Sequence, residues 1–68
     1  MSSGIDEALR DRVAEEIERF NEAFSAAEKD ETPQNLEALA EAADRLMRAV
    51  GRVLIEAKRQ LGDAKRPG

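Results

Sequence analysis

The sequence contains no cysteine, histidine, tryptophan or tyrosine. Without cysteine the chain cannot form a disulfide, and without cysteine and histidine it lacks the usual ligands of a structural zinc ion. The commonest general base and the best nucleophile of enzymes are missing for the same reason. We therefore predict a protein that is not an enzyme and that carries no cofactor and no metal ion.

The remaining polar residues suggest no catalytic or metal site. Ser25 and Lys29 are four residues apart and could bring an amine near a hydroxyl, but polar residues near a helix end explain them equally well. The four glycines are too scattered to form a phosphate-binding loop. Four carboxylates point away from the apolar residues without a histidine beside them, so we interpret them as a solvated helix face: Asp11, Glu15, Glu18 and Glu22.

Long apolar runs are absent too. No segment approaches the about 18 apolar residues of a membrane-spanning helix, and no apolar signal-peptide region stands at the N-terminus. We therefore expect a cytoplasmic protein without membrane contact. The net charge of −4 argues against nonspecific nucleic-acid binding. Eight arginines against three lysines, with abundant alanine and glutamate, would suit a bacterial or phage protein from a GC-rich genome.

What the chain does contain is two amphipathic segments. Drawn at 100° per residue, an arc of about 120° contains Ile5, Leu9, Val13, Ile17, Phe20, Phe24 and Ala27, which predicts a first helix over about 4–28. Ser3 with Asp6 is typical of a capped helix start. This segment ends in a charged stretch without an apolar anchor.

A second helix is predicted over about 33–61. Thr32 followed by Pro33 is a typical helix start, because threonine caps the free N–H groups and proline suits the first helical position. Gly62 is typical of a helix end, and it leaves a tail at 62–68. The loop at 29–32 is short enough to make the two helices antiparallel neighbours. We therefore predict an all-α fold, a single helical-hairpin domain over 1–68.

The apolar face of the second helix is too wide for a hairpin alone. Its apolar residues fit heptad positions a, d and e, as in helices of bundles of four or more. A chain of 68 residues without disulfides or metals also needs another source of stability. We therefore expect the hairpin to dimerise into a four-helix bundle. The predicted oligomer interface comprises Ile17, Phe20, Phe24, Leu39, Ala43, Leu46, Met47, Val50, Val53, Leu54 and Leu61.

One surface of the second helix has functional promise. Four arginines fall within an arc of about 60° opposite the apolar face, with one isoleucine at its edge. Acidic residues near the start of a helix and basic residues near its end also complement the helix dipole, which would explain the position of these arginines without any function. The leading hypothesis is a non-enzymatic oligomerising or adaptor protein that contacts another protein; the alternative is a small nucleic-acid-binding regulator. The candidate partner patch comprises Arg45, Arg48, Arg52, Ile55 and Arg59.

Overall fold

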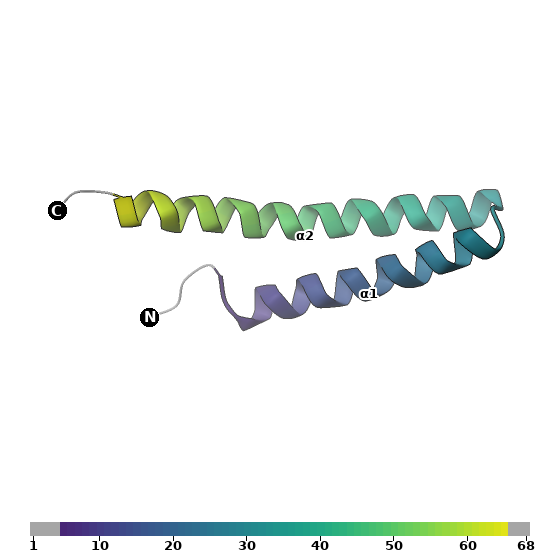
Figure 1. The fold of residues 1–68 in the computed structure, drawn as a ribbon, viewed down its shortest axis with the longest axis horizontal. Coiled ribbons are helices and arrows are strands. Elements are labelled where there is room, and N and C mark those ends of the chain that lie inside the picture. The colour runs from purple at the N-terminus through teal and green to yellow at the C-terminus, as the bar shows by residue number, and fades with distance from the viewer. Residues whose placement is uncertain (1–4, 66–68) are drawn as a thin grey trace.

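The computed structural model describes residues 5–65 of the chain. It consists of two antiparallel helices, α1 (Glu7–Lys29) and α2 (Pro33–Lys65), and this part of the chain holds no strand (Figure 1). The predicted all-α hairpin is confirmed. The molecule measures 57 × 17 × 12 Å along its principal axes, so it is one layer of two helices lying side by side.

Helix α1 begins later than the sequence suggests, because Asp6 is its capping residue. The Asp6 side chain accepts a hydrogen bond from the backbone N–H of Leu9 at 3.0 Å, which satisfies one of the free donors at the helix start. The expected start at residue 4 is therefore three residues too early. Ser3, the other expected capping residue, lies outside the described residues.

The connection between the helices is held by polar contacts. Thr32 caps α2 as predicted, since its hydroxyl accepts a hydrogen bond from the N–H of Asn35 at 3.1 Å. The Asn35 side-chain amide then reaches back and donates to the carbonyl oxygens of Asp30 at 2.8 Å and Ala26 at 3.3 Å. Asn35 thus ties the first turn of α2 to the last turn of α1.

Replacing this asparagine should loosen the hairpin. Asn35→Ala removes two hydrogen bonds to backbone carbonyls, and we expect a loss of about 1–2 kcal/mol in the free energy of unfolding. Urea unfolding followed by circular dichroism measures the effect. The matched control is Gln34→Ala, an exposed neighbour whose side chain makes no hydrogen bond within residues 5–65, and it should change stability by less than about 0.5 kcal/mol. Equal effects of both variants would contradict the role of Asn35.

Helix α2 is longer than predicted and continues through Gly62 to Lys65. The expected end at Leu61 rested on Gly62 as a terminator. Glycine costs only about 1 kcal/mol relative to alanine inside a helix, so it weakens the helix without ending it. Ala64 and Lys65 are good helix formers, and Lys65 lies in the last turn, where a cation favours the helix dipole.

The seam between α1 and α2 is built from alanines and half-buried larger apolar side chains. Among the described apolar residues only Ala27 and Ala49 are buried, and no large side chain is fully buried. The other apolar seam residues recur every three or four positions and are half-buried: Leu9, Val13, Phe20, Ala23, Leu39, Ala42, Leu46 and Val53. The hairpin therefore has a contact line rather than a core.

The isolated hairpin exposes much more surface than a compact protein of its size. Its accessible surface is 5709 Å², whereas a globular monomer of 7.5 kDa is expected to expose roughly 4,200 Å². Its radius of gyration of 16.1 Å compares with about 11 Å for a compact domain of this length. The hairpin is therefore elongated rather than compact.

Neither helix, within the part of the chain that the structure describes, combines the length and the apolar character needed to cross a membrane. The cytoplasmic location stays a prediction.

Candidate functional site

Two surfaces of the hairpin remain without a partner, and the first is apolar. We call it the apolar face and define it by seven large side chains, between 44% and 72% exposed: Ile17, Phe24, Leu36, Met47, Val50, Leu54 and Leu61. On α2 these residues belong to a series with alternating steps of four and three, completed by Ala40, Ala43 and Ala57. Such a 4–3 series forms one stripe along a helix, as in coiled coils.

The structure divides the predicted oligomer interface into two groups. Phe20, Leu39, Ala43, Leu46 and Val53 are half-buried on or beside the seam, so the hairpin itself covers part of them. The other six predicted residues belong to the apolar face, and Met47 is the most exposed of them at 72%. The ring centroids of Phe20 and Phe24 lie 5.8 Å apart, so the two rings connect the seam to the apolar face. Five of the predicted interface residues thus pack on or beside the seam, and the other six are exposed; their role in an oligomer stays a prediction.

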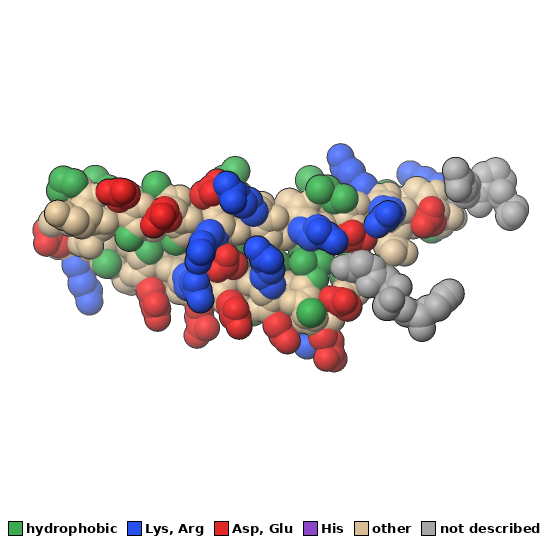
Figure 2. Space-filling model, turned by 180° about the vertical axis from the view of Figure 1, so that it is seen from behind, with side chains coloured by type: hydrophobic (Ala, Val, Ile, Leu, Met, Phe, Trp, Pro, Cys, Tyr) green, Lys and Arg blue, Asp and Glu red, His purple; other side chains and the backbone are tan. Residues whose placement is uncertain are grey.

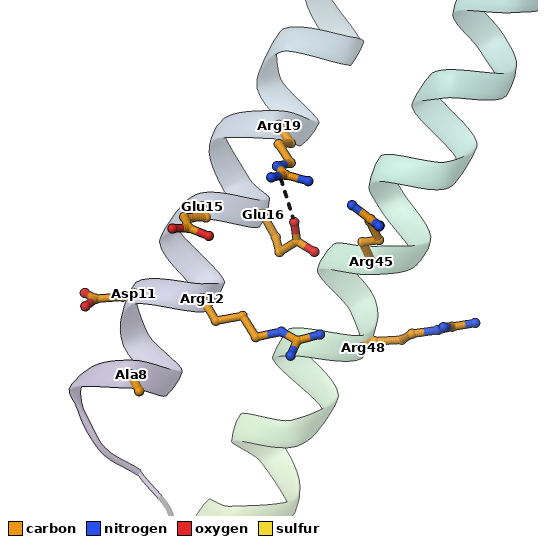
Figure 3. Close-up of a pocket in the computed structure, with 8 residues that line it drawn as sticks. All are labelled: Ala8, Asp11, Arg12, Glu15, Glu16, Arg19, Arg45 and Arg48. Atoms are coloured by element: carbon orange, nitrogen blue, oxygen red, sulfur yellow. Dashed lines mark ion pairs between the residues drawn. The ribbon is translucent and has the colours of Figure 1, made fainter.

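The second surface is a charged hollow on the other side of the seam. A cavity of about 540 Å³ is lined from α1 by Ala8, Asp11, Arg12, Glu15, Glu16 and Arg19 and from α2 by Arg45 and Arg48, so four arginines lie beside three carboxylates. In Figure 3 the side chains of Arg12 and Glu16 both point toward α2, whereas Asp11 points away from it. The sequence predicted the α2 arginines but missed the two from α1.

An adjoining hollow of about 530 Å³ is less polar. Its lining includes the small residues Ala8, Ala49 and Gly51, beside Arg52 and Ile55. The Ile55 side chain is 62% exposed, and its position next to arginines agrees with the sequence-based interpretation. The arginine groove, as we name the two hollows together, is rimmed by Arg12, Arg19, Arg45, Arg48, Arg52 and Ile55.

The arginines of this surface differ in whether they form an ion pair. Arg48 pairs with Asp44 at 3.1 Å along α2, and Arg52 and Arg59 both lie 3.5 Å from one carboxylate oxygen of Glu56. Arg12 and Arg45 have no ion-pair partner among the described residues. Arg12 and Arg45 thus place two cations, without an ion pair within residues 5–65, where the two helices face each other. Arg59 lines neither hollow.

Two glutamates on the seam are buried, which the sequence analysis missed. Glu16 is 8% exposed, and its carboxylate oxygen lies 3.9 Å from Arg19 Nε. Glu56 is 3% exposed, and its second oxygen, Oε2, is buried without a hydrogen-bond partner in the described part of the molecule. Both continue the 4–3 spacing of the seam residues, so extending that series would have found them.

The two surfaces lie on different sides of the hairpin. At 100° per residue, the α2 stripe of the apolar face and the α2 arginines are separated by roughly 150° around the helix. Figure 2 shows basic side chains gathered along α2 and the seam, with acidic side chains along the outer edge of α1. One side of this flat molecule thus carries the apolar face, and the other carries the arginine groove.

No group of three or more acidic side chains among residues 5–65 is arranged to hold a metal ion. Comparison of the chain with protein-family models, curated proteins and solved structures finds no match. The two surfaces are therefore interpreted from their own chemistry.

Proposed function

We propose that this chain is a non-enzymatic protein that associates with a second copy of itself and acts as an adaptor through protein–protein contacts. The observation that carries the proposal is the apolar face, an uninterrupted stripe along most of α2 whose large side chains are about half exposed. Exposed apolar patches of this extent on small proteins mark interaction sites. A hairpin without a buried core also needs a partner for its own stability.

The area to be covered fits a stable homodimer. The surface of one hairpin exceeds that expected for a compact monomer by about 1,500 Å². Covering this excess on two copies would bury about 3,000 Å² in total, which lies in the range of obligate homodimers. This supports the four-helix bundle as the form in which the protein acts.

The arginine groove provides the adaptor contact in this proposal. Arg12 and Arg45 are unpaired in the described structure, and Ala8, Ala49 and Gly51 leave room beside them for an apolar side chain. An acidic segment with one apolar anchor would match both features, because arginine binds carboxylates in a bidentate geometry. In the dimer each copy would present one such groove.

Light scattering coupled to size-exclusion chromatography tests the self-association. We expect a species of twice the 7.5 kDa chain mass at tens of micromolar protein. A well-folded monomer under these conditions would refute the proposal, since the hairpin would then fold without a second copy. A larger oligomer would retain self-association and reject the four-helix bundle.

Nucleic-acid binding is the second candidate, and the four arginines around one hollow are the observation that favours it. Phosphate contacts would make binding weaken steeply between about 50 and 200 mM salt, because bound counterions are released. Arginine contacts with an acidic segment are screened over the same range, so the class of ligand bound, and not salt dependence alone, separates the two candidates. Gel-shift or anisotropy measurements with duplex and single-stranded RNA and DNA at both salt concentrations would separate the two candidates.

A further inference from the structure

Large and small side chains follow one another along the apolar stripe of α2, and their sequence favours one relative direction of two paired copies. Its members are Leu36, Ala40, Ala43, Met47, Val50, Leu54, Ala57 and Leu61, at steps of four and three. Consider an antiparallel pair centred midway between Met47 and Val50. Each residue then faces the residue of the second copy that lies equally far from this centre on its other side. Met47 then faces Val50 of the second copy, and Ala43 faces Leu54 of the second copy.

This pairing balances the layers along the whole stripe. Leu36 falls opposite Leu61 of the second copy, and alanine meets alanine in only two layers, Ala40 with Ala57 and its symmetry equivalent, each between larger ones. A parallel pair in register would instead place alanine against alanine in three layers, at Ala40, Ala43 and Ala57. Packed helices favour alternating large and small side chains, because voids of even a methyl group are costly.

The charges beside the stripe point the same way. One flank carries Glu37 and Asp44 in its first half and Lys58 and Lys65 in its second half, and all four side chains are exposed. Antiparallel pairing brings Glu37 beside Lys58 of the second copy, with an axial offset of about 3 Å at 1.5 Å per residue. A parallel pair would gather the acidic residues of both copies at one end and the lysines at the other.

We infer that the protein dimerises through antiparallel pairing of α2 with α2 of a second copy, about a two-fold axis between Met47 and Val50, with Glu37 and Lys58 as the intermolecular ion pair. This inference rests on the proposed self-association and specifies its geometry. It also places the two arginine grooves on outer surfaces of the dimer, because they lie away from the pairing stripe. The dimer is then a bivalent adaptor.

Spin labels at the two internal glycines of α2 test the orientation. A Cβ at Gly51 or Gly62 meets no atom within 4 Å, and the chain has no cysteine that would compete for the label. In the antiparallel dimer the axial separation of the two copies is about 8 Å for Gly51→Cys and about 40 Å for Gly62→Cys. In a parallel dimer both variants would give the same short separation.

The three outcomes of this experiment are distinct. A short distance at Gly51→Cys together with a long one at Gly62→Cys supports the antiparallel dimer. Short distances at both overturn the inference and leave the proposed function intact. Absence of dipolar coupling at both positions, with a monomer mass by light scattering, overturns the proposed function itself.

Charge reversal provides an independent test on unlabelled protein. Glu37→Lys and Lys58→Glu should each raise the dimer dissociation constant roughly three- to tenfold, because each replaces two symmetry-related attractions by repulsions. The double variant should recover most of the loss, since the pair is restored with its signs exchanged. If the two effects simply add, Glu37 and Lys58 are not neighbours and the antiparallel arrangement is wrong.

Discussion

Val50→Asp is expected to abolish dimerisation and, with it, most of the helical structure at low micromolar concentration. Val50 is 49% exposed in the single hairpin, so the hairpin alone gives the substitution little reason to be harmful. In the proposed dimer the same side chain would lie near the two-fold axis, and the change would bury two carboxylates close to each other. An unpaired buried charge costs about 3–5 kcal/mol, and here there are two. Light scattering and circular dichroism over a range of concentrations measure both consequences.

Ile55→Asp is the matched control for this experiment. Ile55 is more exposed than Val50, at 62%, and lies on the same helix little more than one turn away. It faces the arginine groove rather than the apolar face, so its replacement should leave dimer mass and stability within about 0.5 kcal/mol of the parent. If Ile55→Asp also disrupts assembly, α2 associates through two faces and the oligomer is larger than a four-helix bundle. If Val50→Asp remains dimeric, the apolar face does not mediate assembly.

The sequence predicted the hairpin well because its signals are local. The 3.6-residue periodicity and the Thr32–Pro33 start depend only on neighbours along the chain, and the start agrees with the Thr32 hydrogen bond. The helix ends were less predictable. Asp6 and Ser3 are both acceptable capping residues in a sequence, and Gly62 was read as a terminator although glycine is tolerated inside a helix.

The division of the apolar residues between two surfaces was the harder problem. A broad apolar arc contains both the seam and the apolar face, and periodicity alone does not say which edge the other helix covers. Leu46 and Met47 are adjacent in the sequence, yet the first is half-buried beside α1 and the second is 72% exposed. Only the α2 side of the arginine groove was predicted, for a similar reason. Arg12 and Arg19 join the α2 arginines only when the two helices are placed side by side.

The buried glutamates show how charge on the seam limits the stability of the hairpin. Glu56 occupies a seam position where the preceding residues of the series are apolar, and only one of its oxygens lies near arginine. Arg52 and Arg59 are themselves 66% and 69% exposed, so their attraction to Glu56 is weakened by solvent. The Glu56 carboxylate therefore loses most of its contacts with water when the protein folds, and contacts with arginine replace only part of them.

Glu56→Leu should consequently stabilise the protein, although it removes two ion pairs. Leucine has a similar volume and the two exposed arginines return to water, so we expect a gain of about 1–3 kcal/mol in the free energy of unfolding. Urea unfolding at one fixed protein concentration measures this gain, because the stability of a dimer depends on concentration.

Glu56→Gln keeps the shape without the charge and still buries polar atoms that need partners, so it should stabilise the protein less than Glu56→Leu. Glu41→Leu, at an exposed position of the same helix, controls for the added apolar side chain and should change stability by less than about 0.5 kcal/mol. A loss of stability in Glu56→Leu would mean that the ion pairs with Arg52 and Arg59 outweigh the desolvation of the carboxylate. Glu56 would then be a net stabiliser of the hairpin.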